Sequence, residues 1–386
     1  HRAGGRAPGG DGRPPGRGGT SVGILTAGFG LAWGQELVLL TPLPLLVLAN
    51  LAETAGGRRA GLRLAGEVIL VALPALVVVI GVAEGLAALA ARTSGPAVAA
   101  GFGLAAAGGL AGLAGSAPVL RRLARVMPLD PGNQVHRLAV VLTVGLVAVQ
   151  VVTQLTSDVL AAAAAGPSLS RLDLVAQEIP FLLAAVIGIG IWIRRSPAAA
   201  AQRLGVAWPR PWQVLLGVAA AGLFYAFGVG ADALAQWLTP GLAQRVNAAS
   251  GRIFSGLGDP VGIATIAIAA GVCEELFFRG ALQPRLGLFW PALVFASVHT
   301  QYGLSLDALA VLVLALGLGL LRRYTNTTTS ALCHVAYNTL VGVGIGGLGV
   351  VPAIAVEAAL LVAAAATMPA FRQLLTGGVG NRRPVG

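Results

Sequence analysis

The chain has 386 residues, of which 56% are hydrophobic and 11% are charged, and its mean hydropathy is +0.81. Soluble domains average about 25% charged residues, so this composition excludes a soluble enzyme, a disordered chain and a disulfide-stabilised scaffold. It predicts an all-α, polytopic helical membrane protein in the lipid bilayer, with about 10 to 11 transmembrane helices.

The formal net charge is +11 and the pI is 11.3, and all 26 basic residues are arginine. In a soluble domain this balance suggests nucleic-acid binding. Here the arginines stand in short groups between apolar runs, which is the pattern of loop anchors in a membrane protein. We therefore expect no nucleic-acid partner.

Residues 1–20 form a tail rich in Gly, Pro and Arg, which lacks the apolar core and cleavage site of a signal peptide and is expected to be disordered. Eleven apolar segments follow, and each is a candidate membrane helix. In chain order they are 23–51, 65–90, 97–118, 138–163, 174–193, 212–238, 260–280, 287–302, 306–321, 327–347 and 350–371.

The arginines are distributed unevenly between the two sets of loops. The loops after odd-numbered segments, together with the C-terminal tail, hold 18 arginines, and the other loops with the N-terminal tail hold 8. The positive-inside rule then predicts a multi-pass protein of the cell membrane with a cytoplasmic C-terminus. The four arginines of the N-terminal tail do not fit this orientation unless the first segment fails to span.

The first polar cluster in an apolar region is Glu274-Glu275, followed by Arg279 at the end of segment 260–280. Adjacent helix positions diverge by about 100°, so the two glutamates face different neighbours. Glu275 and Arg279 are four residues apart and can pair along the helix. This pairing leaves Glu274 available for proton transfer, and the cluster lies at the end predicted to be cytoplasmic.

Two more clusters follow on separate apolar segments. Phe295 and His299 are four residues apart, and so are His334 and Asn338, so each pair lies on one helix face. An imidazole and an amide on one face can both donate hydrogen bonds to an oxyanion, as acyl-transfer intermediates require.

The order Glu-Glu-x-x-x-Arg, Phe-x-x-x-His and His-x-x-x-Asn resembles the CPBP family, the CAAX-protease and bacteriocin-processing intramembrane proteases related to the Ras-converting CAAX endopeptidases. The resemblance covers residues 260–347. It implies a C-terminal helical protease core over 256–350. The remaining regions are then an N-terminal multi-helix region of unknown role over 21–255, and a final membrane helix with a short basic tail over 351–386.

The resemblance implies an intramembrane endopeptidase that hydrolyses a peptide bond in a membrane-associated peptide or membrane-protein substrate. Glu274 would be the general base, and His299 would hold the attacking water or transfer its proton. Glu275 would support the site together with Arg279, and the active-site entrance would be cytoplasmic.

In the same resemblance, His334 and Asn338 would stabilise the oxyanion. Glu274, His299 and His334 would also supply three ligands to a zinc ion, with the fourth position left for water. The His-Glu-x-x-His motif of soluble zinc peptidases is absent. The cofactor therefore stays open between none and a divalent metal such as zinc, and we favour water activation without an obligate metal.

The alternative hypothesis is a non-catalytic membrane scaffold or bacteriocin-immunity-type protein that keeps the same core. Such a protein is expected to lose Glu274 or one of the histidines, and this chain keeps all three motifs. The sequence carries no signal for an oligomeric state.

Overall fold

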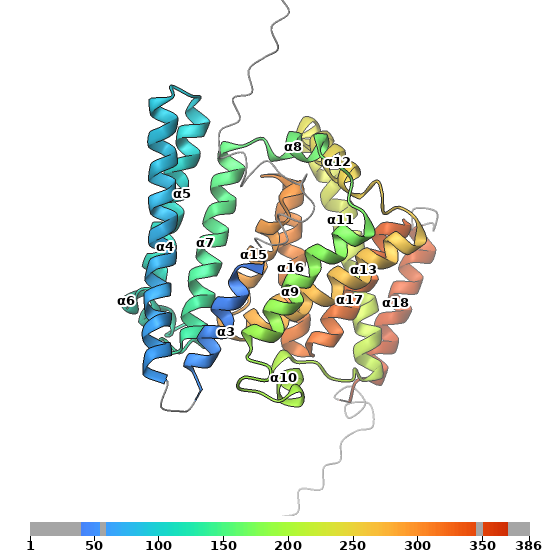
Figure 1. The fold of residues 1–386 in the computed structure, drawn as a ribbon. Helices are drawn as coiled ribbons and strands as arrows, with labels where there is room; N and C mark the ends of the chain where they lie inside the picture. Colours follow the sequence, from blue (N-terminus) through green and yellow to red (C-terminus); the bar gives the residue numbers. More distant parts are fainter. Residues whose placement is uncertain (1–39, 55–58, 345–349, 370–386) are drawn as a thin grey trace, which may run out of the picture.

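The computed structural model describes residues 40–54, 59–344 and 350–369, and these residues form helices and connecting turns without strands (Figure 1). The α-helices are α3 (Pro42–Ala52), α4 (Arg59–Ala90), α5 (Gly95–Ala114), α6 (Ala117–Leu123), α7 (Gln134–Thr156), α8 (Val159–Ala165), α9 (Arg171–Gly188), α10 (Pro197–Leu204), α11 (Pro211–Leu238), α12 (Pro240–Phe254), α13 (Pro260–Glu275), α14 (Gln283–Leu286), α15 (Phe289–Val298), α16 (Leu306–Tyr324), α17 (Thr327–Val343) and α18 (Val350–Thr367). A π-helix, η1 (Leu276–Leu282), continues α13, and a 3₁₀ turn, η2 (Thr300–Tyr302), follows α15.

The ten predicted segments from 65–90 onward each overlap a helix of the structure. The first predicted segment, 23–51, lies largely outside the described residues, and only α3 represents it. Among the described residues, five helical stretches are long and apolar enough to cross a membrane, namely Ala60–Ala90, Gly95–Ala114, Gln134–Thr156, Pro211–Leu238 and Pro260–Leu286. This confirms the all-α, multi-pass membrane class.

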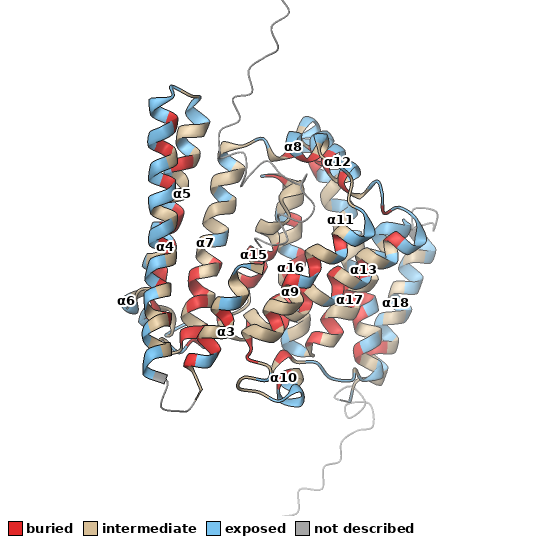
Figure 2. Cartoon of the chain, in the orientation of Figure 1, coloured by how far each residue is buried: buried red, intermediate tan, exposed pale blue. Residues whose placement is uncertain are grey.

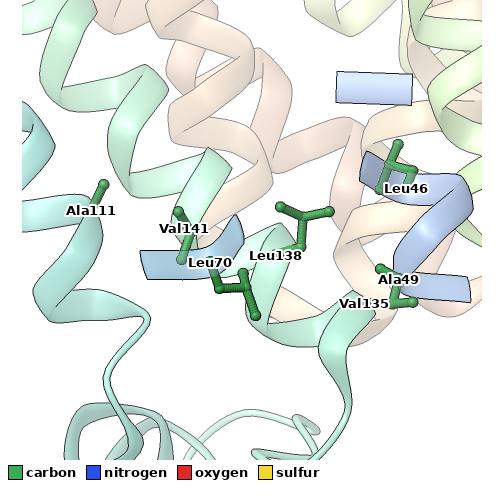
Figure 3. Close-up of a cluster of buried hydrophobic side chains, with 7 residues drawn as sticks. All are labelled: Leu46, Ala49, Leu70, Ala111, Val135, Leu138 and Val141. Atoms are coloured by element: carbon green, nitrogen blue, oxygen red, sulfur yellow. The ribbon is translucent and has the colours of Figure 1, made fainter. Parts of the chain in front are cut away.

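The helices form two groups that meet at α3 and α15 (Figure 1). α4, α5 and α7 pack together on one side, while α9, α11, α13, α16, α17 and α18 form the other group. Figure 3 shows the buried cluster that joins α3 to α4, α5 and α7: Leu46, Ala49, Leu70, Ala111, Val135, Leu138 and Val141. The glutamate motif and the His334 motif lie in the second group, and the Phe295–His299 motif lies on α15, where the two groups meet.

Many residues of α4, α5 and α18 are exposed (Figure 2), and they include large apolar residues. Val71 is 68% exposed and Val351 is 78% exposed. In water such surfaces drive association, but in a bilayer they face lipid tails of the same polarity. Burial in Figure 2 is concentrated on the inward helix faces.

Glycines allow the α4–α5 pair to pack at close range. A Cβ atom added at Gly108 would lie 2.8 Å from the carbonyl oxygen of Pro74, and one at Gly112 would lie 3.3 Å from the Pro74 Cβ. Gly108 and Gly112, four residues apart, therefore allow close helix packing, as small residues commonly do in membranes.

Candidate active site

The end of α13 places the two adjacent glutamates inside the second helix group. α13 begins at a favourable N-terminus, because the Asp259 side chain accepts a hydrogen bond from the Gly262 N–H at 3.0 Å and Pro260 occupies the first turn. It ends at Glu275, where the backbone widens into the π-helix η1. π-helical turns are rare and often occur at functional sites, and the sequence pattern did not predict this one.

Glu275 is fully buried and is bound by side chains from two helices. Arg279 Nη1 lies 3.2 Å from Glu275 Oε1, so the predicted i, i+4 pair is present. The Ser330 hydroxyl of α17 donates to Glu275 Oε2, and His334 Nδ1 lies 3.2 Å from Oε1. A buried carboxylate is stable only when it is paired and hydrogen-bonded, and Glu275 meets both conditions.

Arg279 is 1% exposed, which is rare for an arginine. Its Nη2 donates to the Ala315 carbonyl oxygen at 3.2 Å, and its guanidinium carbon lies 4.6 Å from the centre of the Phe295 ring. Its Nη1 forms an ion pair with Glu275 rather than an aligned hydrogen bond. Arg279 thus compensates the charge of Glu275 and also packs as part of the core.

His334 lies between the two glutamates. Its Nδ1 faces Glu275 Oε1 at 3.2 Å, and its Nε2 faces Glu274 Oε2 at 3.8 Å. The carboxylate of Glu275 is an acceptor, so Nδ1 carries the proton in this contact. Glu275 therefore fixes the orientation of the His334 ring, as a carboxylate commonly does for a functional histidine.

Glu274 is buried, and its Oε2 has no hydrogen-bond partner among the described residues. A second carboxylate, Glu178 of α9, lies within electrostatic range of it, and the Glu178 Oε2 is also buried without a partner. The adjacent glutamates therefore have different environments: Glu275 is fully bound, whereas Glu274 retains free acceptor capacity inside the protein.

His299 is the residue at which α15 ends, with a non-helical backbone conformation. Its Nδ1 lies 2.7 Å from the Phe295 carbonyl oxygen, and its ring stacks on the Phe295 ring with 4.6 Å between centroids. The same Phe295 ring lies 5.9 Å from the His334 ring. The Phe295 ring therefore lies near both histidine rings and fixes the plane of His299, while the Nε2 of His299 has no partner among the described residues and can accept a hydrogen bond.

Asn338 lies one turn beyond His334 on α17 and is partly buried. Its side-chain amide makes no hydrogen bond to the described residues. The structure thus brings Glu274, Glu275, Arg279 and His334 into one cluster. It places His299 against the Phe295 ring, which also lies near Arg279 and His334, and Asn338 lies one turn further along α17.

The proposed zinc ligands do not converge. Among the residues that the structure describes, no group of three or more His, Cys, Asp or Glu side chains is arranged to hold a metal ion. Glu274 and His334 approach each other, but His299 is turned toward the Phe295 carbonyl group and stacked against its ring. The side chains as arranged do not fit the three-ligand zinc site that the resemblance implies.

Two residues of the cluster were not identified from the sequence, Ser330 and Glu178. Ser330 is four residues before His334, so the spacing Ser-x-x-x-His-x-x-x-Asn was available as a signal for one shared helix face. Glu178 is a single acid on a distant segment, and only the packing of α9 against α13 brings it near Glu274.

Close contact between α13 and α17 brings His334 to the glutamates, and Gly271 permits it. A Cβ atom at Gly271 would lie 2.6 Å from Val335 Cγ2 and 2.9 Å from the Val335 backbone nitrogen. Gly271→Ala is therefore expected to lower the free energy of unfolding by about 1–3 kcal/mol. Thermal unfolding in detergent measures the effect, with Gly109→Ala as the control because nothing lies within 4 Å of its added Cβ. Equal effects of the two substitutions would contradict the close contact.

The comparisons with known proteins identify one similarity. The family model of type II CAAX prenyl endopeptidase Rce1-like proteins matches residues 257–340, a range that contains all three motifs. No curated protein and no solved structure matches the chain.

Proposed function

We propose, from the match of residues 257–340 to the CAAX protease family model, that the protein is an intramembrane endopeptidase that cleaves a membrane-associated peptide or membrane protein. The observation that carries the proposal is the position of His334, held between Glu275 at 3.2 Å and Glu274 at 3.8 Å in a buried site. Glu274 can accept a proton, and the His334 imidazole beside it is held in a fixed orientation. This arrangement suits the transfer of an acyl group to water.

In the proposed reaction, Glu274 removes a proton from water, and His299 orients that water through its free Nε2. The resulting hydroxide attacks the carbonyl carbon of the scissile bond, and the carbonyl oxygen becomes an oxyanion. When the C–N bond breaks, the proton held by Glu274 passes to the leaving nitrogen. The products are a carboxylic acid and an amine, so one water is consumed for each bond cut.

His334 and Asn338 are proposed to stabilise the oxyanion. His334 donates from Nε2 when both ring nitrogens carry protons, and the Glu275 carboxylate beside Nδ1 compensates that positive charge while Glu274 holds the proton taken from water. The amide of Asn338 lies one turn further along the same face of α17. Both are donors in a largely buried site, where such hydrogen bonds are stronger than in water.

Cleavage of a library of membrane-anchored peptides by the chain in lipid vesicles tests the proposal, with the products identified by mass spectrometry. His334→Ala is expected to lower the cleavage rate about 100- to 1000-fold, the typical effect of removing one oxyanion donor. His136→Ala is the matched control, because His136 lies at the start of α7, outside the site. Absence of cleavage by the wild-type chain would favour the scaffold hypothesis.

A chelator distinguishes a metal-free mechanism from one that depends on zinc. Because the candidate zinc ligands do not converge, we expect a strong chelator to leave the cleavage rate unchanged. Loss of activity that zinc restores would show that the site rearranges around a metal ion and would overturn the metal-free mechanism.

A further inference from the structure

Four arginines gather at one end of the protein, away from the candidate active-site carboxylates. Arg194 and Arg195 lie in the turn after α9, Arg203 lies in α10 and Arg285 lies in α14. All four are partly buried, and their charges lie within electrostatic range of one another. In the part of the chain that the structure describes, none of them forms an ion pair with a carboxylate.

Arginines at the opposite end of the helices are compensated differently. Arg171 pairs with Asp259, and Arg245 of α12 pairs with Asp158 (Figure 1 shows α12 at the end opposite α10). Two acids lie in this region: the charge of Glu53 acts on Arg194, and Asp130 acts together with Arg285 on His136. Glu53 pairs with Arg63 at 3.4 Å, and Asp130 accepts the N–H of Gly132 at 2.8 Å.

The four guanidinium groups donate to neutral oxygen atoms instead of carboxylates. Arg203 donates to the carbonyl oxygens of Gly280 and Ala281 in η1, at 2.9 and 3.3 Å. Arg194 donates to the side-chain oxygen of Asn50 at 2.8 Å, and Arg195 donates to a backbone carbonyl of the preceding turn. These acceptors satisfy some N–H groups and leave the positive charge in place.

The guanidinium group of Arg285 has hydrogen-bond donors that are weakly used or unused. Within the described ranges, its Nη1 has one long contact, 3.4 Å to the Pro128 carbonyl oxygen, and its Nε is buried without a partner. Burial and the positive charges of Arg285 and Arg195 lower the pKa of the Arg203 guanidinium to about 10. A partly desolvated group of like charges is unfavourable by itself, so an anion bound among them would stabilise it.

Exposed tryptophans flank the four arginines. Trp192 is 78% exposed and lies two residues before Arg194, and Trp208, in the segment between α10 and α11, is 97% exposed. Trp192 also holds a positive φ of 58°, a conformation uncommon for a bulky residue. Tryptophan side chains are enriched at the level of lipid headgroups, which indicates that this end of the protein lies at a membrane surface.

We propose that Arg194, Arg195, Arg203 and Arg285 bind the phosphate group of an anionic phospholipid headgroup at this end of the helices. The planar forks of several guanidinium groups suit phosphate oxygens, and basic pockets between membrane helices are known to hold anionic headgroups. Because Arg203 also binds the carbonyl groups of η1, the lipid would stabilise the π-helix that follows Glu275. The site does not depend on the proposed protease activity.

The test measures binding of phosphatidylglycerol to the full chain in detergent by native mass spectrometry, with phosphatidylcholine of the same acyl chains as reference. The double variant Arg195→Gln/Arg285→Gln is expected to bind phosphatidylglycerol about thirtyfold more weakly, at about 1 kcal/mol for each arginine. The control Arg121→Gln/Arg122→Gln removes the same charge from exposed positions on α6 and is expected to change binding less than threefold.

Inorganic phosphate tests whether the bound anion is a lipid headgroup or a soluble phosphate. For a lipid site, phosphatidylglycerol raises the melting temperature of the wild type and inorganic phosphate does not. Stabilisation of the wild type by inorganic phosphate alone would assign the site to a soluble ligand and overturn the lipid proposal. Equal phosphatidylglycerol binding by the Arg195→Gln/Arg285→Gln variant and the wild type would overturn the site itself.

Discussion

Replacing Arg279 by methionine is expected to lower the free energy of unfolding by about 3–5 kcal/mol, the typical cost of leaving one partner of a buried ion pair alone. Glu275 has no exposed surface, and Arg279 is its cationic partner on the same helix. Methionine keeps much of the packing against the Phe295 ring, so the measured loss reports mainly the uncompensated charge. Thermal or denaturant unfolding in detergent gives the value.

Two controls make the Arg279 prediction specific. In Glu67→Gln, the ion pair with Arg137 is lost at a site where the Glu67 side chain is 46% exposed, and such pairs contribute about 0–1 kcal/mol. In the double variant Glu275→Gln/Arg279→Met, both charges are removed, and stability is expected to recover by more than half of the single-variant loss. If the double variant were as unstable as the single one, packing rather than charge would explain the effect.

Replacing Glu274 by glutamine is expected to lower kcat about 100- to 10,000-fold, the usual contribution of a general base. Glutamine has nearly the same shape as glutamate, but its amide cannot accept the proton of water. Because the Glu274 carboxylate makes no ion pair with arginine and its Oε2 has no hydrogen-bond partner, the melting temperature should fall little or rise. Kinetic measurements on a single cleaved peptide provide kcat and KM.

Glu84→Gln is the matched control for Glu274, since Glu84 is a partly buried glutamate on α4, outside the second helix group. It should leave kcat unchanged. The variant Glu178→Gln adds a sharper comparison, because Glu178 is the other carboxylate with a buried, unpartnered oxygen near the site. If Glu274→Gln kept full activity and Glu178→Gln lost it, the general base would be Glu178 on α9 and not Glu274 on α13.

Long apolar runs in the sequence predicted the corresponding helices well. Apolar runs of about 20 residues with few charges have few alternatives to a membrane helix, and the segments 65–90 and 212–238 correspond closely to α4 and α11. α12, Pro240–Phe254, was not predicted as a helix because polar and apolar residues alternate along it and its mean hydropathy is low. It is an amphipathic helix packed on α8 and η2, and its existence depends on those partners.

The sequence by itself determined the membrane class and the pairs that act within one helix, since spacings of four residues bring Glu275 to Arg279 through local geometry alone. Only the tertiary structure decided which glutamate pairs with which histidine nitrogen, because that depends on how closely α13 and α17 approach at Gly271. It also decided that His299 is held against Phe295 and that Glu178 lies near Glu274. Contacts between helices distant in the chain follow from packing of their whole surfaces, which no local spacing encodes.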